Sequence, residues 1–132
     1  MKPSKSTNEE APFVRRRNYI ENEKMQIDLA PIALNLLRNT GISEEKELKI
    51  EFFFYSRNQI KADALAEALT KLKYDVYTCK SAGRQNLILV TGCTTKMKID
   101  DDTIKYWTEN MSDIAYRFDC KFDGWGTTPD QD

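Results

Sequence analysis

The sequence predicts an α+β fold, and three features of its hydrophobic pattern support this class. Apolar and polar residues alternate over residues 48–55, as in a half-buried β-strand. Residues 60–72 and 104–118 instead repeat apolar side chains at intervals of three and four, which is typical of amphipathic helices. Segments 74–78 and 87–95 are rich in aliphatic residues and Thr, a composition that favours strands. With 132 residues, the chain is long enough for one domain with one core.

Residues 1–17 are predicted to form a flexible arm, because Ser, Thr, Asn, Pro and charged residues follow one another there without helical or strand periodicity. The arm is basic, since Glu9 and Glu10 are outweighed by Lys2, Lys5, Arg15, Arg16 and Arg17. Ordered structure is expected to begin near Tyr19, and residues 18–132 are expected to form a single domain. Because the formal net charge of the chain is -1, a basic arm then precedes an acidic body.

The first helix is predicted to be short and amphipathic, over residues 29–38. Asp28 is a suitable N-cap, Pro31 falls in the first turn where its missing N–H is tolerated, and Gly41 comes just past the end. The residues expected on its apolar face are Leu29, Ile32, Ala33, Leu36 and Leu37.

The strand over residues 48–55 has aromatic side chains on both faces. Its apolar face is formed by Leu48, Ile50, Phe52 and Phe54, and the opposite face by Lys49, Glu51, Phe53 and Tyr55. A capping box of Ser56 and Gln59 is predicted to start the next helix, in which apolar residues recur at helical spacing from Ile60 to Leu72.

A hairpin and a second long helix complete the pattern. Strands 74–78 and 87–95 are expected to be joined by a turn around Gly83. The three Asp residues at 100–102 crowd one helix start, where negative charge is favourable next to free backbone N–H groups. A last short strand is predicted over residues 120–122.

After the first helix, the order of elements is β-α-β-β-α-β, which is the order of ferredoxin-like domains. We therefore predict a ferredoxin-like βαββαβ sandwich with an additional N-terminal helix. Two helices would cover one face of the sheet. The other face, with Phe53 and Tyr55, would be open unless the first helix covers it.

Phe53 and Tyr55 have two interpretations. Aromatic residues on an open sheet of this kind stack bases in RNA-recognition domains, and here they could act together with Arg15, Arg16 and Arg17. Alternatively, the first helix packs its apolar stripe over the two rings and completes a second core layer. The second interpretation is favoured, because that stripe must be buried somewhere and the hairpin strand lacks the aromatic and basic cluster of RNA-recognition domains.

Several classes of catalytic site lack their usual residues. The chain has no His, the commonest general base and metal ligand. Its three Cys are widely spaced without a C-x-x-C pair, which favours reduced and packed thiols over disulfides or zinc. The glycines form no phosphate-binding motif, and helix capping explains the Asp residues at 100–102. We therefore expect no enzymatic activity, no metal and no cofactor.

The composition also bears on location. A net charge of -1 gives no overall attraction to RNA or to a membrane surface. No apolar run is long enough for a transmembrane helix, and the start of the chain is polar where a secretory signal is apolar. A cytoplasmic location is expected.

The most unusual segment is Asp123, Gly124, Trp125, Gly126 and Thr127. The two glycines allow a tight turn or a close backbone approach, and Trp125 has a large ring with one N–H donor. One interpretation is a C-terminal turn whose Trp closes the edge of the core. The other is a binding site, because Trp is enriched among the residues that dominate protein interfaces.

The segment Phe122–Thr127, followed by an acidic Pro-Asp tail, resembles the C-terminal Y-D-G-W-G-T segment of the RraB family of ribonuclease E inhibitors. The resemblance covers about residues 25–130. The upstream features that agree are the apolar helix ending at Gly41, the aromatic strand 52–55, the Ala-rich helix ending at 72–76, and the strand leading to Thr94, Lys96 and Met97.

The resemblance implies a ferredoxin-like fold and a non-catalytic bacterial regulator that binds ribonuclease E and alters RNA processing. The sequence differs from the proteobacterial inhibitors, because only Asp130 and Asp132 follow Asp123 in place of a long acidic tail, and because it adds a basic arm. The partner is therefore predicted to be a protein, ribonuclease E or another RNA-processing protein, bound through residues 123–127. The alternative remains a nucleic-acid-binding module. Oligomeric state is left open.

Overall fold

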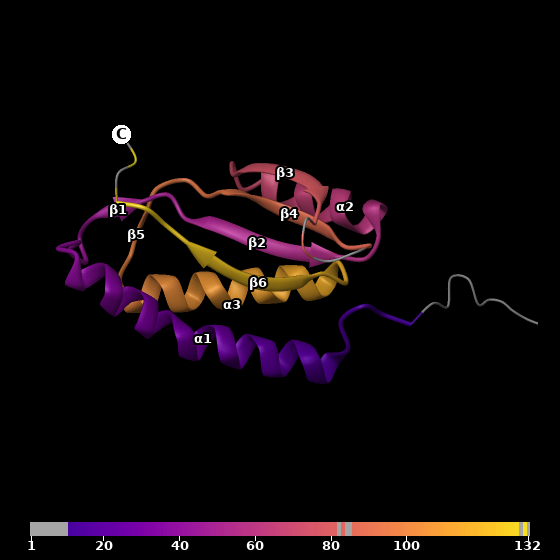
Figure 1. Cartoon of the computed structure of the whole chain (residues 1–132), viewed down its shortest axis with the longest axis horizontal. Helices are drawn as coiled ribbons and strands as arrows, with labels where there is room; N and C mark the ends of the chain where they lie inside the picture. The colour runs from indigo at the N-terminus through magenta and orange to yellow at the C-terminus, as the bar shows by residue number, and fades with distance from the viewer. Residues whose placement is uncertain (1–10, 82, 84–85, 130, 132) are drawn as a thin grey trace, which may run out of the picture.

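The computed structural model describes residues 11–81, 83, 86–129 and 131. This part of the chain forms three helices and six strands: α1 (Arg16–Asn39), β1 (Glu47–Leu48), β2 (Glu51–Ser56), α2 (Gln59–Thr70), β3 (Asp75–Lys80), β4 (Ile88–Cys93), β5 (Met97–Lys98), α3 (Asp101–Arg117) and β6 (Lys121–Gly126). The α+β class and the additional N-terminal helix are confirmed (Figure 1). None of the described helices has both the length and the apolar character needed to cross a membrane.

Two antiparallel sheets are present in the described residues. The larger has four strands in the order β3-β4-β2-β6, and the smaller consists of β1 and β5. Strand β2 is central, because Phe52 lies opposite Gly92 of β4 on one side and opposite Trp125 of β6 on the other. The hairpin of β3 and β4 is also confirmed.

The core lies between this sheet and its helices. Helix α2 contacts β2, β3 and β4, whereas α3 contacts β6 and α1. Phe52 and Phe54 are fully buried, and the Phe122 ring lies 5.2 Å from the Phe54 ring and 5.8 Å from Trp107, centroid to centroid. Each such side chain contributes about 1.5–3 kcal/mol by leaving water, so these aromatic contacts fix β2, β6 and α3 against one another.

Helix α1 is longer than the sequence predicts. It begins at Arg16 and not near residue 29, so Pro31 lies in its interior, where it cannot donate the usual bond to the carbonyl of Ile27. Arg16 and Arg17, which we assigned to the arm, are in its first turn. Residues 1–10 of that arm lie outside the described residues. Contacts with α3 explain the early start, because the ring of Tyr19 stacks on Tyr116 at 4.2 Å.

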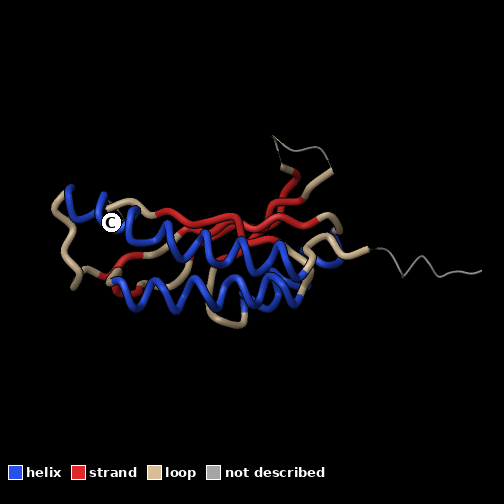
Figure 2. The backbone as a smooth tube through the Cα atoms, turned by 90° about the horizontal axis from the view of Figure 1, so that it is seen from below, coloured by secondary structure: helices blue, strands red, loops and turns tan. Residues whose placement is uncertain are grey.

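The apolar face of α1 also differs from the prediction. The helix buries Gln26, Ala30 and Leu34, while Leu29, Ile32 and Leu36 are 47%, 58% and 64% exposed. The error arises because apolar residues of α1 occupy two adjacent faces: Ala30 and Leu34 are buried in the core, whereas Leu29, Ile32 and Leu36 lie outside it. In Figures 1 and 2, α1 runs beside α3, and it contacts the edge strand β6.

The helix caps follow the predicted chemistry at α3, whereas the N-caps predicted for the other two helices are wrong. Helix α1 has Arg15 at its N-cap position, and Asp28 lies in its interior because the helix begins earlier than predicted. Asp100 caps α3, where its carboxylate accepts the Thr103 N–H at 2.7 Å. The N-cap of α2 is Asn58 and not Ser56, and the Asn58 side chain accepts the Lys61 N–H. Ser56 instead bonds the backbone of Asn58, because it lies two residues before the N-cap position.

Candidate functional site

The segment 123–126 is part of strand β6, so the prediction of a short strand ending at Phe122 is wrong. Gly124 lies opposite Phe53, but Phe122 already lies opposite Phe54, which makes Asp123 an extra residue in a β-bulge. Gly124 has a φ of 127°, a backbone conformation that favours glycine. The bulge lets the strand continue through sequence that resembles a turn.

The end of this segment is held by the backbone before β2. The Thr127 hydroxyl donates to the Lys49 carbonyl at 2.7 Å, and Gln131 both donates to that carbonyl and accepts the Lys49 N–H, each at 2.9 Å. Asp130 and Asp132 lie outside the described residues. Thr127 therefore fixes the chain after β6.

An apolar groove runs along one side of α1. Met25, Leu29, Ile32 and Leu36 follow one another at spacings of four, three and four, and each is at least 47% exposed. These side chains face Phe53 of β2 and part of β6. The groove has a volume of about 450 Å³, and the β6 residues that line it are Asp123, Gly124 and Trp125.

Trp125 has two kinds of neighbour. Its half-buried ring packs against the hydrophobic core, and the same residue lines the groove. Gly124 brings the backbone of β6 close to α1, since a Cβ atom there would lie 3.7 Å from the Gln26 side-chain oxygen. The two interpretations of this segment, closure of the core and a binding surface, are therefore compatible.

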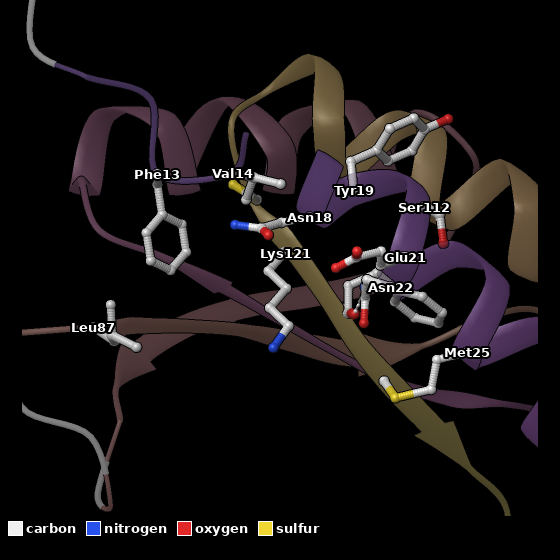
Figure 3. A pocket seen from close by; sticks show the side chains of 12 residues that line it. Phe13, Val14, Asn18, Tyr19, Glu21, Asn22, Met25, Leu87, Ser112 and Lys121 are labelled. Atoms are coloured by element: carbon white, nitrogen blue, oxygen red, sulfur yellow. Dashed lines mark hydrogen bonds between the residues drawn. The ribbon is translucent and has the colours of Figure 1, made fainter. Parts of the chain in front are cut away.

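A second hollow adjoins the groove at Met25, which lines both (Figure 3). Its volume is about 460 Å³. Figure 3 shows Asn18, Glu21 and Asn22 of α1 on one side, with Phe13 and Leu87 farther along the hollow. We call the groove and this hollow together the α1–β6 trough.

Polar groups in the hollow have unused hydrogen-bonding capacity. The Asn22 side-chain amide donates to the Phe122 carbonyl at 2.7 Å and so covers part of the free edge of β6. The Asn22 oxygen and the hydroxyl of Ser112 are buried without a partner among the described residues. The Cys120 thiol also lines the hollow, but burial raises its pKa to about 11, so it remains protonated at neutral pH.

Asp119 holds the segment that leads into α1. Its carboxylate accepts the N–H groups of Phe13 at 2.9 Å and Val14 at 2.8 Å, and it pairs with the Lys61 ammonium at 2.7 Å. Burial alone would raise the pKa of Asp119, but these hydrogen bonds outweigh burial and lower it.

Acidic residues meet where α1 packs on α3. The Tyr19 hydroxyl donates to the Asp113 carboxylate. This hydrogen bond is the main cause, and burial the second, of the raised pKa of Tyr19. The pKa of Glu23 is also raised, mainly by burial and secondly by the negative charge of the nearby Asp113. Among the described residues, no group of three or more His, Cys, Asp and Glu side chains is arranged to hold a metal ion.

The residues proposed for nucleic-acid contact are not brought together in one site. Phe53 lines the groove, whereas Arg15 and Arg16 line a separate hollow with Lys61 and Tyr116. Sequence reasoning missed the α1 wall of the groove. The four, three and four spacing from Met25 to Leu36 was the available signal, but we took this stripe to be buried.

Comparison with models of protein families gives a match. The model of a protein family described as Regulator of ribonuclease activity B matches residues 32–127. The matched region runs from the last third of α1 to the end of β6, so it includes the β6 wall of the groove and, from the α1 wall, Ile32 and Leu36 but not Met25 and Leu29. A search of curated proteins finds no match to the chain.

Proposed function

This chain belongs to the regulator of ribonuclease activity B family, and from this premise we propose that it is a non-catalytic regulator that binds a ribonuclease and modulates RNA processing and decay. Ribonuclease E is the first partner to test. The proposal includes a cytoplasmic location in a bacterial cell. The observation that carries it is the exposed apolar groove, one wall of which is the Asp123–Trp125 part of β6.

The groove has the properties of a protein-binding surface. Contiguous exposed apolar side chains are uncommon on monomeric proteins and mark interaction sites. Trp125 supplies the kind of large aromatic side chain that dominates binding energy at interfaces. Gly126 and Thr127 complete the proposed partner-binding segment, and the bond from Thr127 to the Lys49 carbonyl keeps that segment in position.

The proposed occupant is an amphipathic helix of the ribonuclease. The spacing of Met25, Leu29, Ile32 and Leu36 matches one seam of a coiled coil, so a second helix can lay its own apolar face along them. Eleven residue steps separate Met25 from Leu36, which corresponds to about 16 Å, or three helical turns.

The rim of the groove favours basic residues on that helix. Asp123 lines the groove, and Asp28 directly precedes the groove residue Leu29 on α1. Asp28 pairs with Lys24 at 2.9 Å and Asp123 with Lys121 at 3.9 Å. The first pair is exposed and the second partly exposed, and ion pairs near solvent are weak, so a partner's Lys or Arg can replace the internal lysine at little cost.

We also propose that β2, α2, β3, β4, α3 and β6 form a ferredoxin-like unit. Their order along the chain and the strand order β3-β4-β2-β6 support this proposal. In such a unit α1 is an addition at the β6 edge, and the groove exists because of it.

The test uses exposed residues, because replacing Trp125 would disturb the core as well as the groove. In Ile32→Ser/Leu36→Ser, the two most exposed apolar side chains of the groove are truncated. We expect binding to purified ribonuclease E, measured by calorimetry, to weaken at least tenfold, roughly 1.4 kcal/mol. Relief of inhibition in an RNA cleavage assay should accompany the loss.

The matched control is Ile60→Ser on α2, since Ile60 is 79% exposed and lies outside the groove. Its affinity should equal that of the wild-type protein, and circular dichroism should show all variants folded. Equal affinities for all three proteins would contradict the proposed site. Failure of the wild-type protein to bind ribonuclease E would contradict the proposed partner.

A further inference from the structure

The ends of several strands and helices lie together at one end of the sheet. Lys80 at the end of β3 pairs with Ile88 at the start of β4, and Ile88 pairs with Ser56 at the end of β2. Helix α2 starts three residues after Ser56, and β6 starts at Lys121, opposite Tyr55. This is the right-hand end of the molecule in Figure 1, where α1 also begins.

This end is rich in basic residues that are exposed or, for Lys61 and Lys121, partly exposed. We define the basic end as Arg15, Arg16, Arg17, Arg57, Lys61, Lys80, Arg117 and Lys121. Arg15, Arg16 and Lys61 line one hollow of about 520 Å³, and Arg57 and Lys80 line another of about 550 Å³. The net charge of -1 hides this concentration of positive charge.

The N-terminal segment connects the two hollows. The Arg57 guanidinium lies 5.6 Å from the centre of the Phe13 ring and donates to the Ala11 carbonyl at 2.6 Å. Pro12 and Val14 of the same segment line the other hollow. The basic end is therefore one surface with two adjoining depressions.

Two members of the basic end already have carboxylate partners: Lys61 pairs with Asp119 at 2.7 Å and Lys121 with Asp123 at 3.9 Å. Asp119 lines the first hollow, but its carboxylate is already bound by Lys61 and two backbone N–H groups. In the described parts of the chain, no ion pair joins Arg15, Arg16 or Lys80 to a carboxylate. Their charge is available to a ligand.

We propose that the basic end binds the phosphate backbone of single-stranded RNA. Cations spread over two adjoining depressions fit a ligand with repeated phosphates better than one small anion. Concave depressions suit a flexible strand, whereas a flat anionic membrane would reach only their rims. The family regulates an enzyme whose substrate is RNA, so ribonuclease binding at the groove and RNA binding at the basic end would serve the same process. This site is separate from the groove.

Binding of this kind depends strongly on salt. Each neutralised phosphate of a single strand contributes a slope of about -0.7 to the plot of log affinity against log salt, so four contacts predict a loss of roughly 50-fold between 50 and 200 mM salt.

The experiment measures the fluorescence anisotropy of a labelled oligouridylate with the full chain. The variant Arg15→Gln/Arg16→Gln/Lys80→Gln removes three charges from the basic end. The control Lys46→Gln/Lys96→Gln/Lys105→Gln removes three exposed charges elsewhere. We expect the first variant to bind at least tenfold more weakly and with a reduced salt slope, and the control to change less than twofold.

Three outcomes would overturn the proposal: no binding by the wild-type protein at 50 mM salt, equal losses in both triple variants, or charge-dependent binding to phosphatidylserine vesicles but not to RNA. The groove variant Ile32→Ser/Leu36→Ser should retain RNA binding. That result separates this proposal from the proposed function, because either site can fail without the other. Thermal denaturation of each variant checks that it is folded.

Discussion

Asp119 connects two distant parts of the chain. Phe13 and Val14 precede α1, Lys61 lies in α2, and the Asp119 carboxylate binds all three. A buried backbone N–H without an acceptor is costly, so this one side chain stabilises the entry into α1. Asp119 itself has a φ of 56°, a conformation that Asn tolerates nearly as well as Asp.

Asp119→Asn should therefore lower the free energy of unfolding by about 1–2 kcal/mol at pH 7, because the N–H groups and Lys61 lose a charged acceptor. Folding lowers the pKa of Asp119, so its contribution is present above the unfolded pKa and is lost as the pH falls through the folded pKa. Urea denaturation between pH 2 and pH 7 measures both effects. An unchanged pH profile in the variant would show that Asp119 is not the titrating group.

Glu23→Gln should raise the free energy of unfolding at pH 7, whereas Asp119→Asn lowers it. Burial and the Asp113 charge raise the pKa of Glu23, so the charged form is less favourable in the folded chain than in the unfolded one. The wild-type protein should gain stability as the pH falls through the folded pKa, and the variant should already have this gain at pH 7. We expect roughly 0.5 kcal/mol, because Glu23 is partly exposed and solvent screens the repulsion.

Urea denaturation at pH 7 and pH 4 tests this prediction, with Glu21→Gln as the matched control at an exposed position of the same helix. Stabilisation by Glu21→Gln of the same size would show that the effect is one of overall charge and not of the α1–α3 contact.

At the scale of elements, the bulge in β6 determines how the groove is built. Gly124→Ala should destabilise the protein by roughly 1–2 kcal/mol, because an L-residue is strained at a φ of 127°. Steric overlap does not contribute, since the nearest atom to an added Cβ is 3.7 Å away. Thermal denaturation measures the loss.

Gly126→Ala is the control in the same strand, because a Cβ there meets nothing within 4 Å and the φ of Gly126 is not positive. Its unfolding free energy should be within about 0.5 kcal/mol of the wild-type value, as for a surface substitution. Equal losses at the two positions would mean that the positive φ of Gly124 does not account for the effect, because the lower entropy of the unfolded chain makes Gly→Ala stabilising at a compatible position.

The elements that could be predicted are those with a local signal. The aromatic strand β2, helices α2 and α3 and the hairpin of β3 and β4 follow from periodicity and turn residues. The start of α1 could not be predicted, because it depends on Asp113 and Asp119, about a hundred residues later in the chain. The length of β6 was missed because Gly-Trp-Gly resembles a turn, and only pairing with β2 shows that the bulge absorbs it.

At the scale of the whole molecule, half of the candidate site was visible in the sequence. The Asp123–Trp125 wall of the groove was singled out from its unusual run of Gly and Trp residues and from the resemblance of that run to the family's C-terminal segment. The opposite wall was not, because an apolar stripe on a helix is usually buried, and only the tertiary structure shows which of two adjacent faces remains exposed. The concentration of positive charge was also hidden, since its members are scattered from Arg15 to Lys121 along the chain.

The position of β6 has a consequence for synthesis of the chain. Strand β2 pairs with β6 on one side, and α1 packs against both α3 and β6. These early segments can therefore complete their contacts only after the last segments have been synthesised. While the ribosome is still adding residues 101–126, the apolar side chains of α1 and one edge of β2 have no partner, which favours aggregation. A nascent chain interrupted in that interval should therefore be a substrate for chaperones and proteases.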